Sequence, residues 1–208
     1  MSHIAEFDAA FARCPLIAIL RGVKPDEVEA IGDELVAAGF TLIEVPMNSP
    51  EPLESVSRLA KRFAGRAVIG AGTVLRVEQV QAVADAGGTM IISPNANLDV
   101  IRASAAAGLV SLPGIMTPSE AFAALDAGAT ALKLFPAEAA SPTVLKAMRA
   151  VLPKEARVLP VGGVSPDNMA PWQAAGAPGF GLGSALYKVG MSAEQVGDNA
   201  RAFIAALG

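Results

Sequence analysis

The sequence predicts one α/β domain built as a (β/α)8 barrel, in which eight parallel strands alternate with helices after a short N-terminal helix. Three observations predict this fold. The 208-residue chain is 52% hydrophobic and only 17% charged, short apolar runs recur along it, and helix starts and stops are regularly spaced. At about 26 residues per unit, such a barrel is compact. No linker or shift in composition interrupts residues 1–208, which we expect to form a single domain.

The first element expected is a short helix near residues 4–13, and the helices after it have recurring ends. An alanine followed by a glycine marks five expected helix ends, and the longer intervals between them contain further stops near Gly65 and Pro153. Glycine adopts the left-handed conformation with which many helices end. The repeat is therefore about 20 to 26 residues long, as expected of strand–helix units. The five pairs are Ala38-Gly39, Ala86-Gly87, Ala107-Gly108, Ala127-Gly128 and Ala175-Gly176.

A hydroxyl residue before a proline marks four expected helix starts. The hydroxyl accepts a hydrogen bond from the first turn, and proline suits the first helical position. Thr117 with Glu120, and Ser192 with Gln195, also have the spacing of a capping box. The four starts are Ser49-Pro50, Thr117-Pro118, Ser141-Pro142 and Ser165-Pro166.

A short apolar run lies between each stop and the next start, and we interpret each run as a strand. Because the runs are nearly all apolar, they suit a parallel sheet covered by helices. The intervening helices are amphipathic, as the spacing of Val28, Ile31 and Leu35 indicates. The strands are expected near residues 16–20, 41–46, 67–71, 89–93, 109–112, 130–135, 157–161 and 179–183.

The alternative fold is a doubly wound sheet that binds a dinucleotide. Gly70-Ala71-Gly72 and Gly181-Leu182-Gly183 each begin like the glycine fingerprint of that fold. Leu75 and Leu186 stand where its third glycine would be, so the fingerprint is incomplete at both places.

Composition excludes several classes of function. The formal net charge is −4 with no basic run, so we expect no nucleic-acid partner, and no apolar run reaches the length of a membrane span. Residues 1–12 carry Glu6 and Asp8 and do not resemble a signal peptide, and Cys14 is the only cysteine, so we expect a cytoplasmic protein. His3 is the only histidine, which excludes a Ser-His or Cys-His pair and a histidine-rich zinc site.

Lys133 is the most informative residue, because it interrupts an apolar strand. Lysine is depleted in strands, and burial favours its neutral amine over the ammonium ion. A neutral buried amine can attack a carbonyl carbon and form a Schiff base. The alternative is a structural ion pair, or a side chain that extends to the rim of the barrel.

Glu44 interrupts a second apolar strand and is an expected partner for Lys133. One interpretation makes Glu44 the group that moves protons beside the Schiff-base amine. The other is a structural Lys–Glu pair that lines the barrel.

Arg21 and Thr73 follow the first and third strands, where barrels place their functional residues. The forked donors of Arg21 suit a substrate carboxylate, and the Thr73 hydroxyl could bond the same group. The alternatives are a surface arginine and a helix cap for a segment that starts near Val74.

Glycines follow the last two strands, where barrels commonly bind phosphate on backbone N–H groups. We expect Gly162, Gly163, Gly183 and Ser184 to form such a phosphate site. The alternative is a pair of tight turns.

These residues lie in stretches that resemble the class I aldolases that cleave 2-keto-3-deoxy-6-phospho sugar acids. The resemblance runs in order over essentially the whole chain. As a set these motifs are specific to the family, although none is decisive alone. The stretches are IAILRG (17–22), EVPMNSP (44–50), GAGTVL (70–75), PN (94–95), ALKLFP (131–136), PVGGV (160–164) and GLGS (181–184).

The resemblance implies a role for each candidate residue. Lys133 would form the Schiff base, Glu44 would be the general acid and base, and Arg21 with Thr73 would hold the carboxylate of the pyruvyl half. It also implies that the enzyme needs no metal or other cofactor and is a homotrimer. Pro94 and Phe135 would shape the pyruvyl pocket, and the phosphate would lie on Gly162, Gly163, Gly183 and Ser184.

The resemblance also distinguishes two branches, whose substrates differ at one hydroxyl-bearing carbon. The phosphogluconate branch usually has Leu-Arg-Thr after its second strand and a threonine before the glycine pair. This chain has Met47-Asn48-Ser49 and Val161 at those places. We therefore expect cleavage of the phosphogalactonate substrate to pyruvate and glyceraldehyde 3-phosphate, in galactonate catabolism, with Asn48 and Val161 as candidate specificity residues. Whether Asn48 contacts the substrate or only shapes its loop stays open.

Three other functions compete with this expectation. The first is the phosphogluconate aldolase of the other branch. The second is a sugar-phosphate-binding barrel without catalysis, which would need neither Lys133 nor Glu44. The third is another phosphate-binding barrel enzyme such as an epimerase, which commonly needs a carboxylate pair or metal-binding histidines.

Overall fold

The computed structural model describes residues 2–207, along which parallel strands alternate with helices. All eight expected strands are confirmed within two residues of their predicted bounds. The strands are β1 (Leu16–Ile19), β2 (Leu42–Pro46), β3 (Val68–Gly72), β4 (Met90–Ile92), β5 (Val110–Leu112), β6 (Gly114–Ile115), β7 (Leu132–Leu134), β8 (Val158–Pro160) and β9 (Phe180–Leu182).

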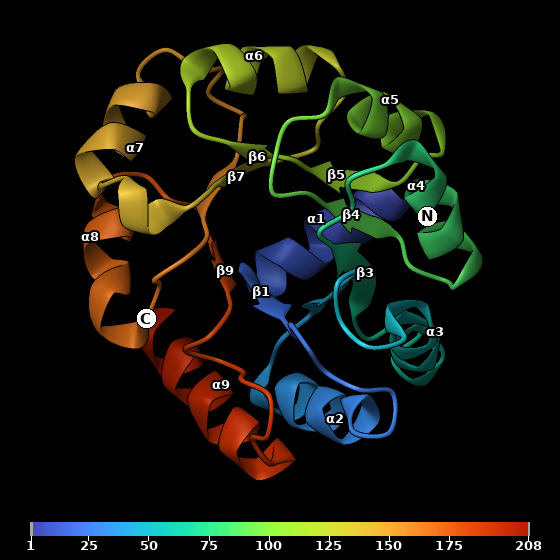
Figure 1. The fold of residues 1–208 in the computed structure, drawn as a ribbon. Coiled ribbons are helices and arrows are strands. Elements are labelled where there is room, and N and C mark those ends of the chain that lie inside the picture. Colours follow the sequence, from blue (N-terminus) through green and yellow to red (C-terminus); the bar gives the residue numbers. More distant parts are fainter. Residues whose placement is uncertain (1, 208) are drawn as a thin grey trace.

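Helices surround the strands, and α1 lies where the sequence predicts a short N-terminal helix (Figure 1). Two short 3-10 helices, η1 (Ala137–Ala139) and η2 (Pro166–Asn168), follow β7 and β8. No helix among residues 2–207 is long and apolar enough to cross a membrane. The α-helices are α1 (His3–Arg13), α2 (Val28–Ala38), α3 (Pro52–Arg62), α4 (Val77–Asp85), α5 (Leu98–Ala106), α6 (Pro118–Asp126), α7 (Pro142–Arg149), α8 (Met169–Ala174) and α9 (Ala193–Leu207).

The strands form a curled parallel arrangement in two hydrogen-bonded parts. Six strands are ordered β5-β4-β3-β2-β1-β9, and three are ordered β6-β7-β8. A parallel bridge between Val161 and Gly181 joins the end of β8 to β9. On the other side, the Lys133 N–H of β7 donates to the carbonyl of Pro113, 2.9 Å away, and Pro113 lies between β5 and β6. Parallel strands have their carboxyl ends at one edge, so the loops that follow them share one end of the molecule.

The short strand β6, which follows the fifth expected strand, was not predicted. β5 ends at Leu112, β6 begins at Gly114, and Pro113 lies between them. Proline has no N–H to donate, so it interrupts the ladder, while its carbonyl still accepts a bond from β7.

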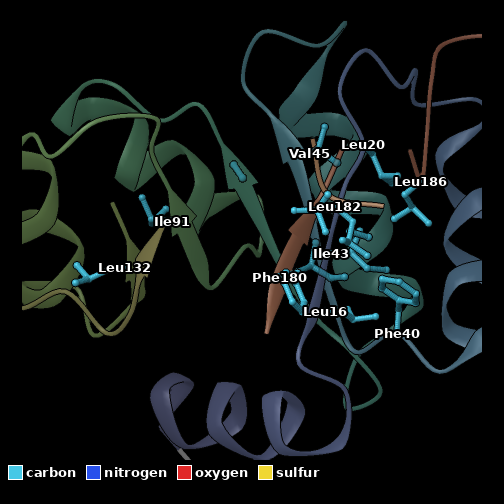
Figure 2. Packing of buried hydrophobic residues seen from close by; sticks show 14 of the residues in the cluster. Leu16, Leu20, Phe40, Ile43, Val45, Ile91, Leu132, Phe180, Leu182 and Leu186 are labelled. Carbon is cyan, nitrogen blue, oxygen red and sulfur yellow. The ribbon is translucent and has the colours of Figure 1, made fainter. Parts of the chain in front are cut away.

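Two apolar layers follow from the alternation of side chains along each strand. The larger layer packs the outer face of the strands against the helices; Figure 2 shows Leu16, Ile43 and Phe180 close together in it. The inner layer holds Ile17, Leu42, Ala131 and other strand residues, with Phe7 of α1 packed among them. Glu44 and Lys133 stand two residues beyond Leu42 and Ala131, so they share this inner face.

The glycine ends and most of the predicted helix starts are confirmed. Each of the five glycines of the Ala-Gly pairs has a positive φ at a helix end. Thr117 and Glu120 form the predicted capping box of α6, Ser141 caps α7, and Ser192 bonds reciprocally with Gln195 at the start of α9. Ser165 caps η2 instead of an α-helix.

Two predicted caps are wrong. Ser49-Pro50 does not begin a helix, because α3 starts at Pro52 and the buried Ser49 hydroxyl instead accepts a bond from the Gly22 N–H, 2.9 Å away. Thr73 does not cap a helix near Val74, since α4 starts at Val77. Both hydroxyl residues lie in loops at the carboxyl edge.

Candidate active site

The structure places every predicted site residue within a strand or just beyond the carboxyl end of one. Glu44 and Lys133 lie within β2 and β7, and the others follow a strand end by one to three residues. This position is the one at which parallel barrels build active sites, because loops from all strands meet there. The others are Arg21, Asn48, Thr73, Pro94, Phe135, Val161, Gly162, Gly163, Gly183 and Ser184.

Lys133 is buried in the inner layer. Its side chain is 5% exposed, and it lines a small apolar cavity of about 10 Å³ together with Ile17, Leu112 and Leu159. Its Nζ lies 4.5 Å from the centre of the Phe135 ring. Burial lowers the pKa of the Lys133 amine; the attraction of Glu44 opposes that shift, and the repulsion of Arg21 adds to it. Burial therefore shifts the Lys133 amine toward its uncharged, nucleophilic form.

Glu44 is buried as deeply, at 1% exposure, and its Oε2 has no hydrogen-bond partner among the described residues. Burial raises the pKa of Glu44 to about 7, although Lys133 and Arg21 act in the opposite direction. A carboxyl group that titrates near neutral pH can both give and accept a proton. A buried oxygen without a partner is costly, so this atom is a candidate for contact with a ligand.

The space for the Glu44 carboxyl group is made by Gly72 on the neighbouring strand. β2 and β3 pair in parallel, and a Cβ atom added to Gly72 would collide with the Glu44 carboxyl group. The missing side chain of Gly72 thus accommodates a protein carboxyl group. A glycine inside a strand next to a charged strand residue was the available signal.

Lys133 and Glu44 do not form a close ion pair. None of the ion pairs within 4.0 Å among residues 2–207 joins them. Each nevertheless affects the pKa of the other, so they lie within electrostatic reach. For both groups burial is the largest cause of the pKa shift and disfavours the charged form, whereas their mutual attraction favours it.

Arg21, Asn48 and Thr73 form a polar group at the rim of the site. The Arg21 guanidinium donates from Nη1 to Asn48 Oδ1 at 2.7 Å and to Thr73 Oγ1 at 3.5 Å. Because a guanidinium group only donates, the Asn48 amide must turn its oxygen toward it and keep its NH₂ group for another acceptor. Thr73 has a φ of 56°, which is unusual for a β-branched residue.

The three apolar candidates, Pro94, Phe135 and Val161, lie at the same edge of the sheet, each after a different strand. Pro94 and Phe135 are half-buried and follow β4 and β7, and Val161 is buried directly after β8. The Val161 carbonyl accepts a bond of 2.9 Å from the Ala137 N–H, which fixes η1 against the end of β8.

The glycine turns differ from one another. Gly162 and Gly163 have φ values of 107° and 64°, so this turn requires glycine. A Cβ atom on either would meet Glu138, which the sequence did not single out. At Gly183 a Cβ atom would meet nothing within 4 Å, and the Ser184 side chain beside it is exposed.

No group of three or more metal-ligating side chains is found in the described part of the chain. The site brings together a buried amine, a buried carboxyl group and a rim of hydrogen-bonding side chains. This combination on a parallel α/β scaffold defines a class, the enzymes that hold a carbonyl substrate on a buried lysine.

The chain belongs to the KDPG and KHG aldolase family, whose model matches residues 7–202. It is 50% identical to the "Probable 2-dehydro-3-deoxy-6-phosphogalactonate aldolase" of Rhizobium meliloti, over 92% of this chain and 91% of that one. It is 47% identical to the 2-dehydro-3-deoxy-6-phosphogalactonate aldolase of Escherichia coli, over 93% and 95% of the two chains.

Solved structures of the family have the same fold. The structure described as native KDPGal superimposes with a TM-score of 0.92 at 47% identity and covers 94% of this chain and 95% of its own. The KDPG aldolase of Legionella pneumophila has a TM-score of 0.80 at 25% identity, with 95% and 94% covered. That structure contains pyruvate captured as a covalent carbinolamine intermediate.

Proposed function

We propose that this chain is a class I aldolase that cleaves 2-dehydro-3-deoxy-6-phosphogalactonate to pyruvate and glyceraldehyde 3-phosphate. The observation that carries the proposal is the buried pair of Lys133, whose amine pKa is lowered, and Glu44, whose pKa is about 7. Relatives that are 47% to 50% identical over nine-tenths of the chain are named 2-dehydro-3-deoxy-6-phosphogalactonate aldolase, one of them as probable.

Lys133 starts the reaction. Its neutral amine adds to the keto carbon of the substrate to give a carbinolamine, and loss of water leaves a protonated imine. The imine accepts electrons from the neighbouring carbon–carbon bond, so the reaction needs no metal ion as an electron sink. The carbinolamine trapped with pyruvate in the Legionella relative supports this route.

Glu44 moves the protons. It removes the proton from the hydroxyl on C4 of the substrate, the C3–C4 bond breaks, and glyceraldehyde 3-phosphate leaves. The electron pair of that bond forms an enamine of pyruvate on Lys133. Glu44 then returns a proton to the enamine carbon, and hydrolysis of the imine releases pyruvate. The raised pKa and the unpaired Oε2 of Glu44 support this role.

Arg21 and Thr73 hold the carboxylate of the pyruvyl half in this proposal. Charge-assisted bonds from a guanidinium group to a carboxylate are short and directional. Asn48 orients Arg21 through its Oδ1, which leaves its NH₂ group for another acceptor. Pro94 and Phe135 close the apolar side of the pyruvyl pocket.

The phosphate lies at the opposite end, at Gly162, Gly163, Gly183 and Ser184. Open space at Gly183 and the exposed hydroxyl residue beside it support this cradle. Val161 precedes Gly162 of this cradle and has a methyl group where the threonine of the phosphogluconate branch has a hydroxyl. We propose that Val161 favours the galactonate epimer, because no hydroxyl is there to bond the gluconate one.

The remaining features of the proposal concern the whole molecule. The Val161–Gly181 bridge and the bond from Lys133 to Pro113 support closure of the two sheets into one eight-stranded barrel that forms a single domain over residues 1–208. A designed cage built from symmetric oligomeric domains contains a chain 47% identical to this one, which supports an oligomer; a homotrimer is our proposal. A cytoplasmic location stays a prediction.

Comparison of kcat/KM for cleavage of the two epimeric phospho sugar acids tests the proposed substrate. We expect the galactonate epimer to be cleaved more efficiently. Faster cleavage of the gluconate epimer would favour the other branch. No cleavage of either, with binding of both, would favour a sugar-phosphate-binding protein.

A further inference from the structure

The Glu138 side chain lies against the Gly162-Gly163 turn, to which our proposed function assigns the phosphate. The mechanism above does not use Glu138. It belongs to η1, which follows β7 and Lys133. The nearest atom to an added Cβ on Gly162 is Oε2 of Glu138, and a Cβ on Gly163 would lie 2.6 Å from Glu138 Cγ. The side chain therefore covers both glycines, and its carboxylate is directed at Gly162.

This placement is fixed by the backbone of η1. The Ala137 N–H donates to the Val161 carbonyl at 2.9 Å, which holds the start of η1 against the residue that precedes the glycine pair. The side chain itself is held less firmly. Glu138 is exposed, and it takes part in none of the ion pairs among residues 2–207.

A carboxylate and a phosphate ester repel one another when both lie on the same turn. Their repulsion is moderate at an exposed position, because water and salt screen it. Rotation of an exposed side chain relieves it at small cost. The glycines, which leave room above their backbone, allow either anion to lie there but not both.

We propose that the Glu138 carboxylate occupies the glycine side of the phosphate cradle, leaves it when a phosphate group enters, and thereby limits the preference of the site for phosphorylated substrates. This inference rests on the proposed function. It assigns to Glu138 a role in substrate selection and not in the chemistry at Lys133.

The test compares condensation of pyruvate with glyceraldehyde 3-phosphate and with unphosphorylated glyceraldehyde. The ratio of the two kcat/KM values measures the preference for phosphate. In Glu138→Gln, which removes the charge and keeps the shape, we expect the ratio to rise about two- to fivefold at low salt. The increase should diminish as the salt concentration rises, because it reflects repulsion between charges.

Glu155→Gln is the matched control. Glu155 is also exposed, but it precedes β8, whereas Gly162 and Gly163 follow that strand. The two positions therefore lie at opposite ends of β8. The same loss of charge at Glu155 should leave the ratio unchanged. An equal rise in Glu155→Gln would show a general effect of net charge and overturn the proposal.

Three further outcomes separate the possible failures. A high ratio in the wild-type protein that stays constant or falls in Glu138→Gln overturns the role of Glu138 alone. A lower ratio and a lower melting temperature in Glu138→Ala, with Glu138→Gln unchanged, would show that the side chain only supports the turn. A wild-type ratio near one, with no inhibition by inorganic phosphate, would remove the phosphate cradle itself and the inference with it.

Discussion

At the scale of single residues, the site is governed by the cost of burying charge. The Glu44 carboxyl group and the Lys133 amine are both almost completely buried, and for each the loss of hydration is the largest cause of its pKa shift. An isolated buried charge is expensive, and a pair compensates only when the contact is close. Burial therefore shifts both groups toward their neutral forms, and Glu44, with a pKa of about 7, can exchange a proton in either direction near neutral pH.

The first prediction concerns the effect of Glu44 on stability. Its pKa of about 7 in the folded protein exceeds the ordinary value of 4.5, so the folded state binds more protons between these values. The contribution of Glu44 to stability is therefore present below about pH 4.5 and is lost as the pH rises through 7. The loss is about 3 kcal/mol.

Glu44→Gln should remove this pH dependence. Denaturant unfolding of both proteins at several pH values measures it: the variant should gain stability relative to wild type as the pH rises from about 4.5 to above 7. Aldol cleavage by the variant should fall strongly, by about 10²- to 10⁴-fold. A stability difference that does not change with pH would contradict the neutral, buried carboxyl group.

The second prediction concerns Val161 and the choice between epimers. Val161→Thr adds a hydroxyl at the end of β8 with little change in volume. We expect the kcat/KM ratio of the gluconate to the galactonate epimer to rise by up to about tenfold, because a substrate hydroxyl gains a partner. Trapping of pyruvate on Lys133 serves as the control and should be unaffected. An unchanged ratio would place the specificity elsewhere, with Asn48 as the next candidate.

At the scale of elements, pairing between strands positions the functional groups. β2 and β3 run in parallel register, and Gly72 provides the space that the Glu44 carboxyl group fills. The same principle holds in a helix pair, where a Cβ on Gly197 of α9 would collide with the Glu34 carboxyl group of α2. The two cases differ in exposure. Glu34 is a surface residue paired with Arg201, whereas Glu44 is enclosed.

The third prediction compares Gly72→Ala with Gly197→Ala. In Gly72→Ala the buried carboxyl group has no room to move, so we expect a loss of about 1 to 3 kcal/mol in unfolding free energy and a large loss of activity. In Gly197→Ala the exposed Glu34 side chain rotates away, and alanine favours the helix. Stability should stay within about 1 kcal/mol of wild type, and activity should be retained. Equal losses in both variants would contradict the role assigned to Gly72.

Local signals also decide which elements could be predicted. Thr117 with Glu120 and Ser141 with Pro142 form real caps because the bonds that define a cap lie within a few residues. Ser49 fails because its hydroxyl bonds to Gly22, which lies on another loop. Pro113 separates β5 from β6 for a local reason, its missing N–H, and the predicted strand ends at the residue before it.

At the scale of the whole molecule, the repeat of strand and helix predicted the parallel α/β fold and therefore the edge at which the site lies. Lys133 and Glu44 could be identified because charged residues in apolar strands are rare. Glu138 could not, because an exposed glutamate after a strand is ordinary in sequence. Its contact with Gly162 depends on a tertiary bond between η1 and the end of β8. The Arg21–Asn48 bond likewise joins loops that are 27 residues apart.

Reductive trapping of pyruvate tests the central claim most directly. The protein is incubated with pyruvate, reduced with borohydride and digested, and its peptides are analysed by mass spectrometry. We expect a single reduced pyruvyl group on Lys133, no adduct in Lys133→Met, and no cleavage by that variant. An unmodified wild-type protein, a label on another lysine, or normal turnover by Lys133→Met would contradict the account.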